Sequence, residues 1–532
     1  MCGIAGVIRA EASAPCEEAL ARRMACALSH RGPDGQGAWA GAGAALGHAR
    51  LSIIDLAGGA QPMGSEDGRI QVVFNGEIYN FRELRSELES RGHKFRTGSD
   101  TEVIVHLVEE KGPDAVESLD GMFAFAAWDA RSRRLVLARD RLGKKPLYWH
   151  ASVGRIAFAS ELSALLVDPS IPRRLRPGAV DDFLALQYVP APGTILEGVF
   201  KLPPASVLTW EGGEASVRRY WAPGAEGTAA FAGGYAEAKA RLRGLVEAAV
   251  QKRLISDVPL GAFLSGGIDS TLVVGTMAAL SKDPVKTFSI GFEESGFDER
   301  AYAREAAAAF KTDHREFVVR AEAADVLPTL VRRYGEPFGD SSAIPTYYLS
   351  KMTREHVTVA LSGDGGDEAF FGYERYPAVR LAASLDRVLP RFVRRALSAL
   401  SGLAARAPFL SAVRRAHARR FLEGLPLSPL ERYRRWISIW RDEERTALYA
   451  PAFQESLAGH DPVAYLSGAW ESAPGSGAAA RTNALDVLTY LPGDILAKVD
   501  AASMAVGLEV RCPFLDPAVV DFGLSLPLEW KR

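Results

Sequence analysis

Cysteine, net charge and long apolar runs are all scarce in this chain. Its 532 residues include four cysteines and carry a formal net charge of −2. Four scattered thiols form neither a disulfide framework nor a CxxC zinc site, and they fit a reducing compartment. The small net charge gives no general attraction to nucleic acid or to anionic membranes. No apolar run approaches the roughly 18 residues of a membrane-spanning helix. We therefore expect neither nucleic-acid binding nor membrane insertion.

A secretory signal pattern is also missing from the first residues, because Arg9 and Glu11 interrupt the apolar stretch. We therefore expect a cytoplasmic protein. A chain of 532 residues is too long for one hydrophobic core, and its length predicts about two to four domains.

The chain up to about residue 220 shows short β-type runs with frequent glycine turns, and helical patterns lie among them. Such a mixture suits paired sheets with helices packed outside. The predicted strands are residues 3–8, 44–54, 70–74, 122–129, 134–139 and 155–159, and the predicted helices are residues 16–28, 81–91 and 101–111.

The second half of the chain has a different pattern of apolar residues. Residues 222–234 are rich in Gly and Ala without periodicity and are the predicted linker. Beyond them, apolar runs alternate with helical patterns, which predicts a parallel α/β sheet followed by a mostly helical tail. The expected buried strands are residues 258–264, 285–292 and 357–361, and the expected helices include residues 235–254 and 271–280. The arginine-rich segment 379–420 is more consistent with a solvated outer face than with a partner surface, and we assign it no function.

Cys2 directly follows the initiator methionine. Aminopeptidases remove a methionine that precedes a small residue, so we expect Cys2 to carry both a thiol and a free α-amino group. An α-amine has an ordinary pKa of about 8 and is partly unprotonated near neutrality. A nucleophile with its own base is the N-terminal-nucleophile arrangement.

Four polar clusters follow Cys2 in the first half of the chain. They are residues 30–35 (HRGPDG), 50–55 (RLSIID), 75–80 (NGEIYN) and 98–102 (GSDTE). In this order behind Cys2 they resemble the class II glutamine amidotransferases. By that resemblance Cys2 attacks the glutamine amide, and the Asn75 side chain and the Gly76 N–H stabilise the resulting oxyanion.

The resemblance also implies the rest of a glutamine site. Arg50 would bind the α-carboxylate, because a guanidinium can hold a carboxylate bidentately, and Glu77 and Asp100 would lie near the amino-acid end. The implied glutamine-binding set is Arg50, Leu51, Ser52, Ile53, Ile54, Asn75, Gly76, Glu77 and Asp100. A surface ion pair is the alternative for Arg50 and Asp100; beside the other motifs we favour function.

A second group of motifs begins at residues 265–270 (SGGIDS), between a predicted apolar strand and a predicted helix. Backbone N–H groups of such a turn form a cradle for anions such as pyrophosphate. The loop matches neither Walker A nor the G-x-G-x-x-G fingerprint. It resembles the pyrophosphate loop of the ATP pyrophosphatases, which split ATP into AMP and pyrophosphate.

An acidic, glycine-rich run, residues 361–368 (LSGDGGDE), follows about a hundred residues later. The resemblance assigns Asp269 and Asp367 to Mg²⁺, which prefers oxygen ligands, and it gives Asp364 a role in forming an acyl-adenylate. The implied nucleotide-binding set is Leu264, Ser265, Gly266, Gly267, Asp269, Ser270, Ile290, Ser362 and Gly363. A solvated loop is the alternative for this run alone.

Together the two halves resemble the glutamine-hydrolysing asparagine synthetase family over nearly the whole chain. Further matching segments are residues 288–292 (FSIGF), 336–340 (EPFGD), 498–500 (KVD) and 509–516 (EVRCPFLD). The implied fold is an N-terminal α-β-β-α sandwich of the N-terminal-nucleophile type at 2–221, a linker at 222–234, and a parallel α/β sheet of the ATP pyrophosphatase type with a helical tail at 235–532.

The implied reaction is asparagine synthesis: aspartate is activated as β-aspartyl-AMP, and ammonia freed at Cys2 travels inside the protein to attack it. A dry route keeps ammonia neutral and nucleophilic. The expected small molecules are glutamine, ATP, Mg²⁺ and aspartate or another carboxylate acceptor, and the chain could form a homodimer.

Three departures from the family pattern bear on these expectations. Phe371 stands where the family usually has Gly, and Ser163 stands where Lys is common. The family normally continues beyond residue 532 with a stretch that includes a lysine steadying the adenylate chemistry. We therefore expect either a C-terminally short synthetase domain or another cation in that role.

The identity of the acceptor stays open at this point. The scaffold is shared with enzymes that amidate sugars or cell-surface precursors, and with cyclases that make β-lactams or close peptides. The cyclases typically dispense with a working N-terminal cysteine, so Cys2 together with Arg50, Asn75 and Asp100 argues against them. A non-catalytic regulatory or binding relative is disfavoured because both sets of chemical residues are present.

Overall fold

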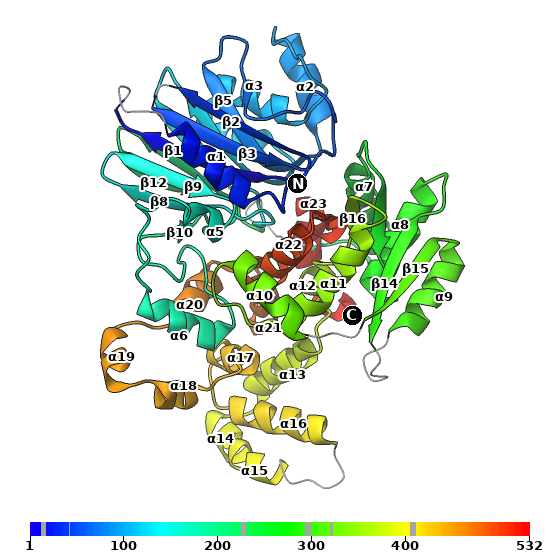
Figure 1. Cartoon of the computed structure of the whole chain (residues 1–532). Coiled ribbons are helices and arrows are strands. Elements are labelled where there is room, and N and C mark those ends of the chain that lie inside the picture. Colours follow the sequence, from blue (N-terminus) through cyan, green and yellow to red (C-terminus); the bar gives the residue numbers. More distant parts are fainter. Residues whose placement is uncertain are drawn as a thin grey trace.

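Two stacked antiparallel sheets form the N-terminal half of the molecule, and a parallel sheet surrounded by helices forms the C-terminal half (Figure 1). The computed structural model describes residues 1–11, 17–41, 43–224, 230–292, 299–319, 323–404 and 411–531. Helices α22 (Leu496–Met504) and α23 (Pro517–Ser525) lie centrally, between the sandwich and the helices formed by residues 375–437 (Figure 1).

The sandwich consists of two six-stranded sheets, with strand orders β10-β8-β9-β1-β3-β2 and β12-β11-β7-β6-β5-β4. All neighbouring pairs in both sheets are antiparallel. The strands are β1 (Gly3–Arg9), β2 (Gly35–Gly41), β3 (Ala44–Arg50), β4 (Met63–Gly64), β5 (Ile70–Ile78), β6 (Gly121–Asp129), β7 (Arg134–Arg139), β8 (Tyr148–Ser152), β9 (Arg155–Ala159), β10 (Phe200–Lys201), β11 (Ser206–Glu211) and β12 (Glu214–Arg219).

Strand β1 shows how the alternation of side chains builds the layers. Ile4 and Ile8 belong to the core between the two sheets, which also holds Trp128 of β6. Ala5 and Val7 point to the opposite face and pack with residues of helix α1 (Glu18–Ala27). A strand with both faces apolar is expected where a sheet is covered on both sides.

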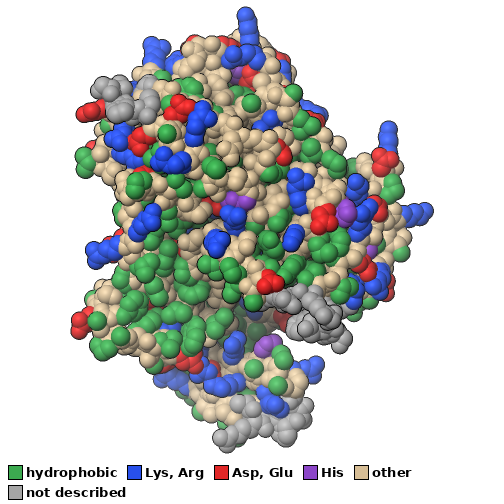
Figure 2. Space-filling model, viewed as in Figure 1, with side chains coloured by type: hydrophobic (Ala, Val, Ile, Leu, Met, Phe, Trp, Pro, Cys, Tyr) green, Lys and Arg blue, Asp and Glu red, His purple; other side chains and the backbone are tan. Residues whose placement is uncertain are grey.

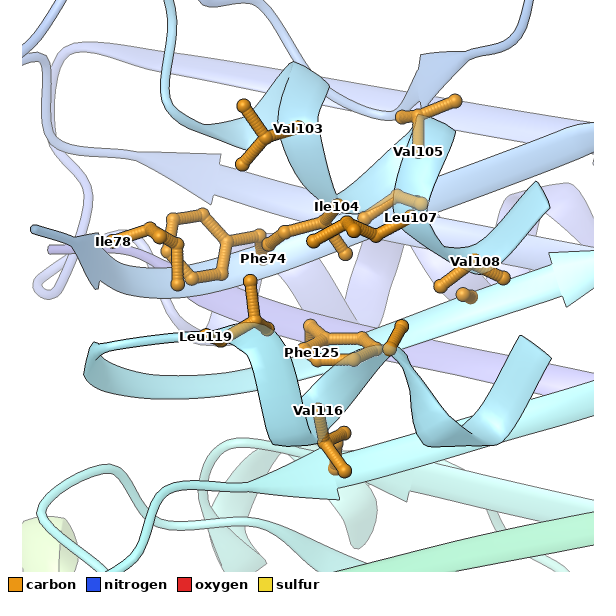
Figure 3. Packing of buried hydrophobic residues seen from close by; sticks show 14 of the residues in the cluster. Phe74, Ile78, Val103, Ile104, Val105, Leu107, Val108, Val116, Leu119 and Phe125 are labelled. Atoms are coloured by element: carbon orange, nitrogen blue, oxygen red, sulfur yellow. The ribbon is translucent and has the colours of Figure 1, made fainter. Parts of the chain in front are cut away.

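Helices α2 (Phe81–Ser90) and α3 (Thr101–Lys111) cover the outer face of the other sheet. Figure 3 shows Phe74 of β5 beside Ile104 and Leu107 of α3. The order of layers is therefore α-β-β-α, which confirms the predicted sandwich. The remaining helices of this half are α4 (Ala115–Ser118), α5 (Leu162–Leu165) and α6 (Pro177–Leu186).

The C-terminal sheet has five strands in the order β15-β14-β13-β16-β17, and every neighbouring pair is parallel. This confirms the predicted parallel α/β architecture. The strands are β13 (Leu260–Phe263), β14 (Lys286–Phe292), β15 (Asp313–Val319), β16 (Val359–Leu361) and β17 (Glu509–Arg511). The helices before the tail are α7 (Tyr235–Arg253), α8 (Ile268–Leu280), α9 (Arg300–Phe310), α10 (Ala323–Tyr334), α11 (Ala343–Arg354) and α12 (Gly366–Phe370).

The tail beyond α12 is mostly helical, as predicted. Its helices are α13 (Arg375–Val388), α14 (Arg391–Ala399), α15 (Ser401–Ala404), α16 (Ala412–Gly424), α17 (Pro429–Ile437), α18 (Asp442–Leu448), α19 (Pro451–Ser456), α20 (Val463–Ser472), α21 (Ala478–Leu488), α22 and α23. The arginine-rich segment 379–420 falls on α13 to α16, apart from residues 405–410, which lie outside the described residues.

Several predicted elements have other bounds in the structure. The strand expected at 70–74 continues to Ile78 and so includes Asn75 and Gly76, and the strands expected at 258–264 and 357–361 are shorter. The strand expected at 44–54 ends at Arg50, because the Ser52 N–H turns away to donate to the Asp34 carboxylate (2.8 Å). The helix expected at 271–280 begins already at Ile268, directly after the glycine turn. The helix expected at 16–28 begins at Glu18, and Cys16 lies outside the described residues.

The predicted linker packs onto the C-terminal half where it is described. The Gly224 N–H donates to the Asp521 carboxylate (3.0 Å), and the Phe231 ring meets Phe522 of α23 edge-on. Residues 225–229 of the linker lie outside the described residues. The assignment of 222–234 as a linker remains a prediction.

Basic and acidic side chains are interspersed over the face of the molecule that Figure 2 shows. Within the described ranges, no helix is both long enough and apolar enough to cross a membrane.

Candidate active sites

Cys2 lies directly before β1, at the middle of the first sheet, and is almost fully buried. Its backbone N–H donates to Oδ1 of Asn75 (3.0 Å), and its Sγ lies 3.9 Å from the carbonyl oxygen of Leu51. Burial raises the pKa of the Cys2 thiol. The thiol therefore needs a base before it can act as a nucleophile.

Asn75 and Gly76 sit side by side in β5, next to Cys2. Nδ2 of Asn75 is buried and, among the described residues, has no hydrogen-bond partner. A buried amide donor without a partner is costly and usually marks a functional role or a bound group. Gly76 must be glycine, because a Cβ there would lie 2.0 Å from the carbonyl oxygen of Met122. Asn75 thus offers a free amide donor close to Cys2, and Gly76 allows the backbone of β6 to approach β5 closely.

Arg50 and Asp100 do not pair with each other in the described structure. The Arg50 guanidinium donates to the backbone carbonyls of Asp55 (2.7 Å) and Leu56 (3.0 Å) and so holds the loop after β3 in place. Oδ2 of Asp100 accepts from the Ile78 N–H (2.9 Å) at the end of β5, and burial raises the pKa of Asp100 to about 6. The surface ion pair considered from sequence is thus not formed.

Three other residues of the predicted glutamine set, Leu51, Ile53 and Glu77, lie near Cys2 or near the interface between the two halves of the molecule. Leu51, Ile53 and Met1 share one buried cluster. Glu77 lies 3.5 Å from Arg511 of β17, and burial together with Glu509 raises its pKa well above the ordinary value. Contact of these residues with glutamine remains a prediction.

Met1 is present in the chain and buried, and its α-ammonium pairs with Oε2 of Glu509 (3.1 Å). While Met1 is attached, the nitrogen of Cys2 is a peptide N–H and cannot act as a base. The use of that nitrogen as a base therefore requires removal of Met1.

The second candidate site begins at the loop between β13 and α8. Gly266 has a left-handed φ of +82°, and a Cβ there would lie 2.4 Å from the backbone of Tyr302. Ser265 and Ser270 close the loop through their hydroxyls (3.0 Å). The first turn of α8 then faces open space, the geometry that favours an anion at a helix N-terminus.

Three carboxylates converge next to this loop. Asp269 stands in the first turn of α8, and a Cβ at Gly366 would lie 2.3 Å from its Oδ2. Burial, and the charges of Asp367 and Asp364, raise the pKa of Asp269 to about 6. Carboxylate oxygens are the ligands that Mg²⁺ prefers, so the donor set suits the Mg²⁺ that the sequence implies.

A cavity of about 1080 Å³ opens over the loop and the acidic run. Except for Gly266, whose neighbour is Tyr302, every residue of the predicted nucleotide and metal sets lines it. These residues are Leu264, Ser265, Gly267, Asp269, Ser270, Ile290, Ser362, Gly363, Asp364 and Asp367. The cavity is large enough for a nucleotide and a second small substrate.

Sequence reasoning missed several polar residues of this cavity. Lys498 of α22 lines it and pairs with Asp340 (2.8 Å), and Tyr490 and Lys531 line it as well. Only the segment of Lys498, residues 498–500, was among those that resembled the family, and no single-sequence signal places α22 at this cavity. Burial lowers the pKa of Lys531 to about 7. The role of either lysine as a substitute cation remains a prediction.

Helix α22 connects the two sites. Asp500 pairs with Arg31 (2.9 Å) and Lys145 (3.4 Å) of the sandwich, and Arg31 donates to the carbonyl oxygen of Cys2 (3.1 Å). Lys498, two residues before Asp500 on the same helix, faces the cavity. The contact is buried, and one rigid helix therefore touches both reaction centres.

We expect Asp500→Asn to lower the free energy of unfolding by about 3–5 kcal/mol at pH 7, because it leaves the buried Lys145 without its partner and the buried Arg31 with Glu161 alone. Burial opposes ionisation of Asp500, but Arg31 and Lys145 hold its pKa below the ordinary value. A carboxylate whose pKa is depressed in the folded state stabilises the fold above its unfolded pKa, and this stabilisation is lost as the pH falls. The difference in stability between the wild type and Asp500→Asn should therefore shrink below about pH 4.

Urea denaturation of the wild type, Asp500→Asn and Asp313→Asn over a pH series measures this effect. Asp313 is a matched control, since it is 48% exposed and lies 3.7 Å from its arginine. Equal stability of all three proteins at pH 7 would contradict the role of Asp500.

Comparison with known proteins agrees with this two-site architecture. A family model for the glutamine amidotransferase domain matches residues 1–221, and a model for asparagine synthase matches residues 241–532. Asparagine synthetase [glutamine-hydrolyzing] 1 of Bacillus subtilis (strain 168) is 34% identical over 551 residues, covering 100% of this chain and 82% of the relative. Asparagine synthetase [glutamine-hydrolyzing] 3 of the same organism is 30% identical over 550 residues, with the same coverage.

A solved structure, the glutamine phosphoribosylpyrophosphate (PRPP) amidotransferase of B. subtilis with ADP and GMP, is similar at 16% identity and a TM-score of 0.31. The match covers 68% of this chain and 81% of that structure's chain. The full-length relatives and the two matching models carry the assignment: the chain belongs to the glutamine-hydrolysing asparagine synthetase family of ATP-dependent ligases.

Proposed function

We propose that this protein makes asparagine from aspartate, using ATP and the side-chain nitrogen of glutamine. The observation that carries the proposal is that helix α22 links two chemically distinct centres. One is a buried Cys2 beside the unpartnered amide nitrogen of Asn75, and the other is an acidic cavity lined by Asp269 and Lys498. Relatives over the full chain that are named asparagine synthetases support aspartate as the acceptor.

The first half-reaction takes place at Cys2. After Met1 is removed, the α-amine of Cys2 accepts the thiol proton, and the thiolate attacks the side-chain carbonyl carbon of glutamine. The resulting tetrahedral intermediate collapses to a glutamyl thioester as the leaving nitrogen takes the proton from the α-ammonium and departs as ammonia. Water then hydrolyses the thioester to glutamate and the free thiol. Nδ2 of Asn75 is already oriented by the bond at its Oδ1, so it can donate to the oxyanion without reorganisation.

The second half-reaction takes place in the cavity. The β-carboxylate of aspartate attacks the α-phosphorus of ATP, pyrophosphate leaves, and β-aspartyl-AMP forms. The loop 265–270 and the first turn of α8 would bind the phosphates. The carboxylates of Asp269 and Asp367 would hold Mg²⁺, which when bound supplies positive charge to the phosphates. Ammonia then attacks the acyl carbon and AMP leaves.

Transfer of ammonia between the centres needs an interior path, since ammonia in water near pH 7 is mostly ammonium. The halves meet through buried residues around Met1, Asp500 and Val510, where little water can enter. Exclusion of water at this contact keeps the nitrogen neutral.

Labelled glutamine tests the proposed reaction directly. Protein is incubated with glutamine carrying ¹⁵N in its side-chain amide, ATP, Mg²⁺ and aspartate, and the products are analysed by mass spectrometry. We expect ¹⁵N in the side-chain amide of asparagine. Label found only as ammonium, or in the amide of a different acceptor, would contradict the proposal.

We expect Asn75→Ala to lower kcat for glutamine hydrolysis by about 10²–10³-fold with a small change in KM, because the lost donor acts mainly on the oxyanion. Glutamate release measures this effect. Asn80→Ala is the control, because Asn80 lies two positions after the end of β5 and bonds to the backbone of Ser118 and Asp120 rather than to Cys2. An equal loss in both variants would show that Asn75 acts only through folding.

A further inference from the structure

A cluster of two histidines and two glutamates lies on the glutaminase half, apart from both candidate sites. His106, Glu109 and Glu110 belong to α3, and His93 lies in the segment between α2 and α3. His106 is buried, whereas His93 and Glu109 are partly open, with side chains 16% and 24% exposed. None of the steps derived above uses these side chains.

Three atoms of the cluster face one point. Nδ1 of His93 lies 3.1 Å from Nδ1 of His106, and Oε2 of Glu109 lies 3.6 Å from each of these nitrogens. A point equidistant from the three atoms is about 2.0 Å from each, which is the bond length of Zn²⁺ to imidazole nitrogen and carboxylate oxygen.

Hydrogen bonding alone accounts for only part of this arrangement. The two imidazole nitrogens can share one proton, but a separation of 3.6 Å is too long for a hydrogen bond from either ring to Glu109. The same separation is ordinary between two ligands of one metal ion. All three atoms can offer a lone pair to the central point at once.

Outer hydrogen bonds hold His93 and Glu109 in place, and ring packing holds His106. Oε1 of Glu110 lies 3.0 Å from Nε2 of His93, so this nitrogen carries the proton and leaves Nδ1 free to coordinate. Arg69 donates to Oε1 of Glu109 (3.2 Å), which leaves Oε2 for the central point. The ring of Phe95 packs edge-on against His106 with centroids 4.7 Å apart. A carboxylate behind a ligating histidine is the usual second layer of a metal site.

We propose that His93, His106 and Glu109 bind a divalent first-row transition metal ion of the Zn²⁺ class. Two imidazoles and one carboxylate suit such ions rather than Mg²⁺ or Ca²⁺, which prefer oxygen ligands alone. The partly exposed side of the cluster leaves a fourth position for water.

The ion would fasten the segment before α3 to the helix. Glu102, one turn before His106, already accepts from the N–H groups of Arg96 and Thr97 in that segment. The segment leads directly to Asp100 at the start of α3. Metal binding is therefore expected to stabilise this part of the fold, and this expectation is independent of the reaction proposed above.

Titration with Co²⁺ and Zn²⁺ tests the site. The full chain is used with Cys2→Ala, which removes a competing thiol, in buffer without Mg²⁺ or ATP. We expect one equivalent of Co²⁺ to bind with visible d–d absorption, and Zn²⁺ to displace it and raise the melting temperature. In that background His93→Gln and Glu109→Gln should each weaken binding by more than about 100-fold, since changes even in the second layer cost up to that much.

His417→Gln is the matched control, because His417 is exposed and lies far along the chain in α16. Unchanged binding in His93→Gln and Glu109→Gln would overturn the proposal, as would no absorption band at millimolar Co²⁺. If either variant fails to fold, X-ray absorption of the Zn²⁺-loaded Cys2→Ala chain decides: two imidazole ligands support the site, and sulfur ligands or oxygen ligands alone contradict it.

Discussion

Replacing Cys2 with alanine is expected to lower glutamine-dependent synthesis by more than about 10³-fold, because no other described group can form the glutamyl thioester. Synthesis from added ammonium should remain within a few-fold of the wild type. Ammonia then enters the cavity from solution, and the residues around Asp269 and Lys498 are unchanged. The two activities should therefore separate cleanly.

Cys26→Ala is the matched control for this experiment, since Cys26 is a free and exposed cysteine at the end of α1. Glutamate and pyrophosphate are followed in parallel with either glutamine or ammonium as the nitrogen source. Loss of both activities in Cys2→Ala would contradict two separable centres. Mass spectrometry of the wild type should also find Met1 removed, because its retention would leave Cys2 without a base.

Asp269→Asn is expected to lower aspartate-dependent pyrophosphate release by more than about 100-fold while glutamine hydrolysis continues. The carboxylate stands in the first turn of α8, at the end of the phosphate loop and beside Asp367. An amide of the same shape removes the negative charge that would hold Mg²⁺ at the phosphates. The variant should therefore lose activity because the reaction at ATP is impaired, and not because the protein fails to fold.

A stability measurement distinguishes these two explanations. The pKa of Asp269 is raised to about 6, above its unfolded value of about 4. Without Mg²⁺ the folded protein therefore loses stability as the pH rises from about 4 to about 6, and the full loss is present above pH 6. Asp269→Asn should melt at a higher temperature than the wild type at pH 8 without Mg²⁺, by about half as much at pH 5, and with little difference at pH 4. Pyrophosphate release near the wild-type rate would contradict the assigned role, as would a lowered melting temperature at pH 8.

Local signals in the sequence predicted much of the architecture. Alternating apolar residues around Ile4 and Ile8 predicted β1, and the helix at 101–111 has the predicted bounds, because an apolar face and a terminal glycine define it. Glycine turns also located the loop at Gly266, where a side chain would meet Tyr302. These features depend on neighbours in the chain.

Contacts between the halves could not be predicted in the same way. Asp500 pairs with Arg31, 469 positions away, and Glu77 faces Arg511. Each of these residues lies in a motif that resembles the family, but no motif predicts which charge it pairs with. Only the docking of α22 and β17 on the sandwich forms these pairs. The metal cluster was missed for a related reason, since His93 and His106 meet only once the segment before α3 folds back.

The rate of pyrophosphate release with different acceptors tests the central claim most directly. Protein is supplied with glutamine, ATP and Mg²⁺, and with aspartate, glutamate or no acceptor, while pyrophosphate and glutamate are measured separately. The account predicts pyrophosphate release that depends on aspartate, with asparagine and glutamate formed alongside it. Glutamate without acceptor-dependent pyrophosphate, or pyrophosphate released with an acceptor other than aspartate, would contradict it.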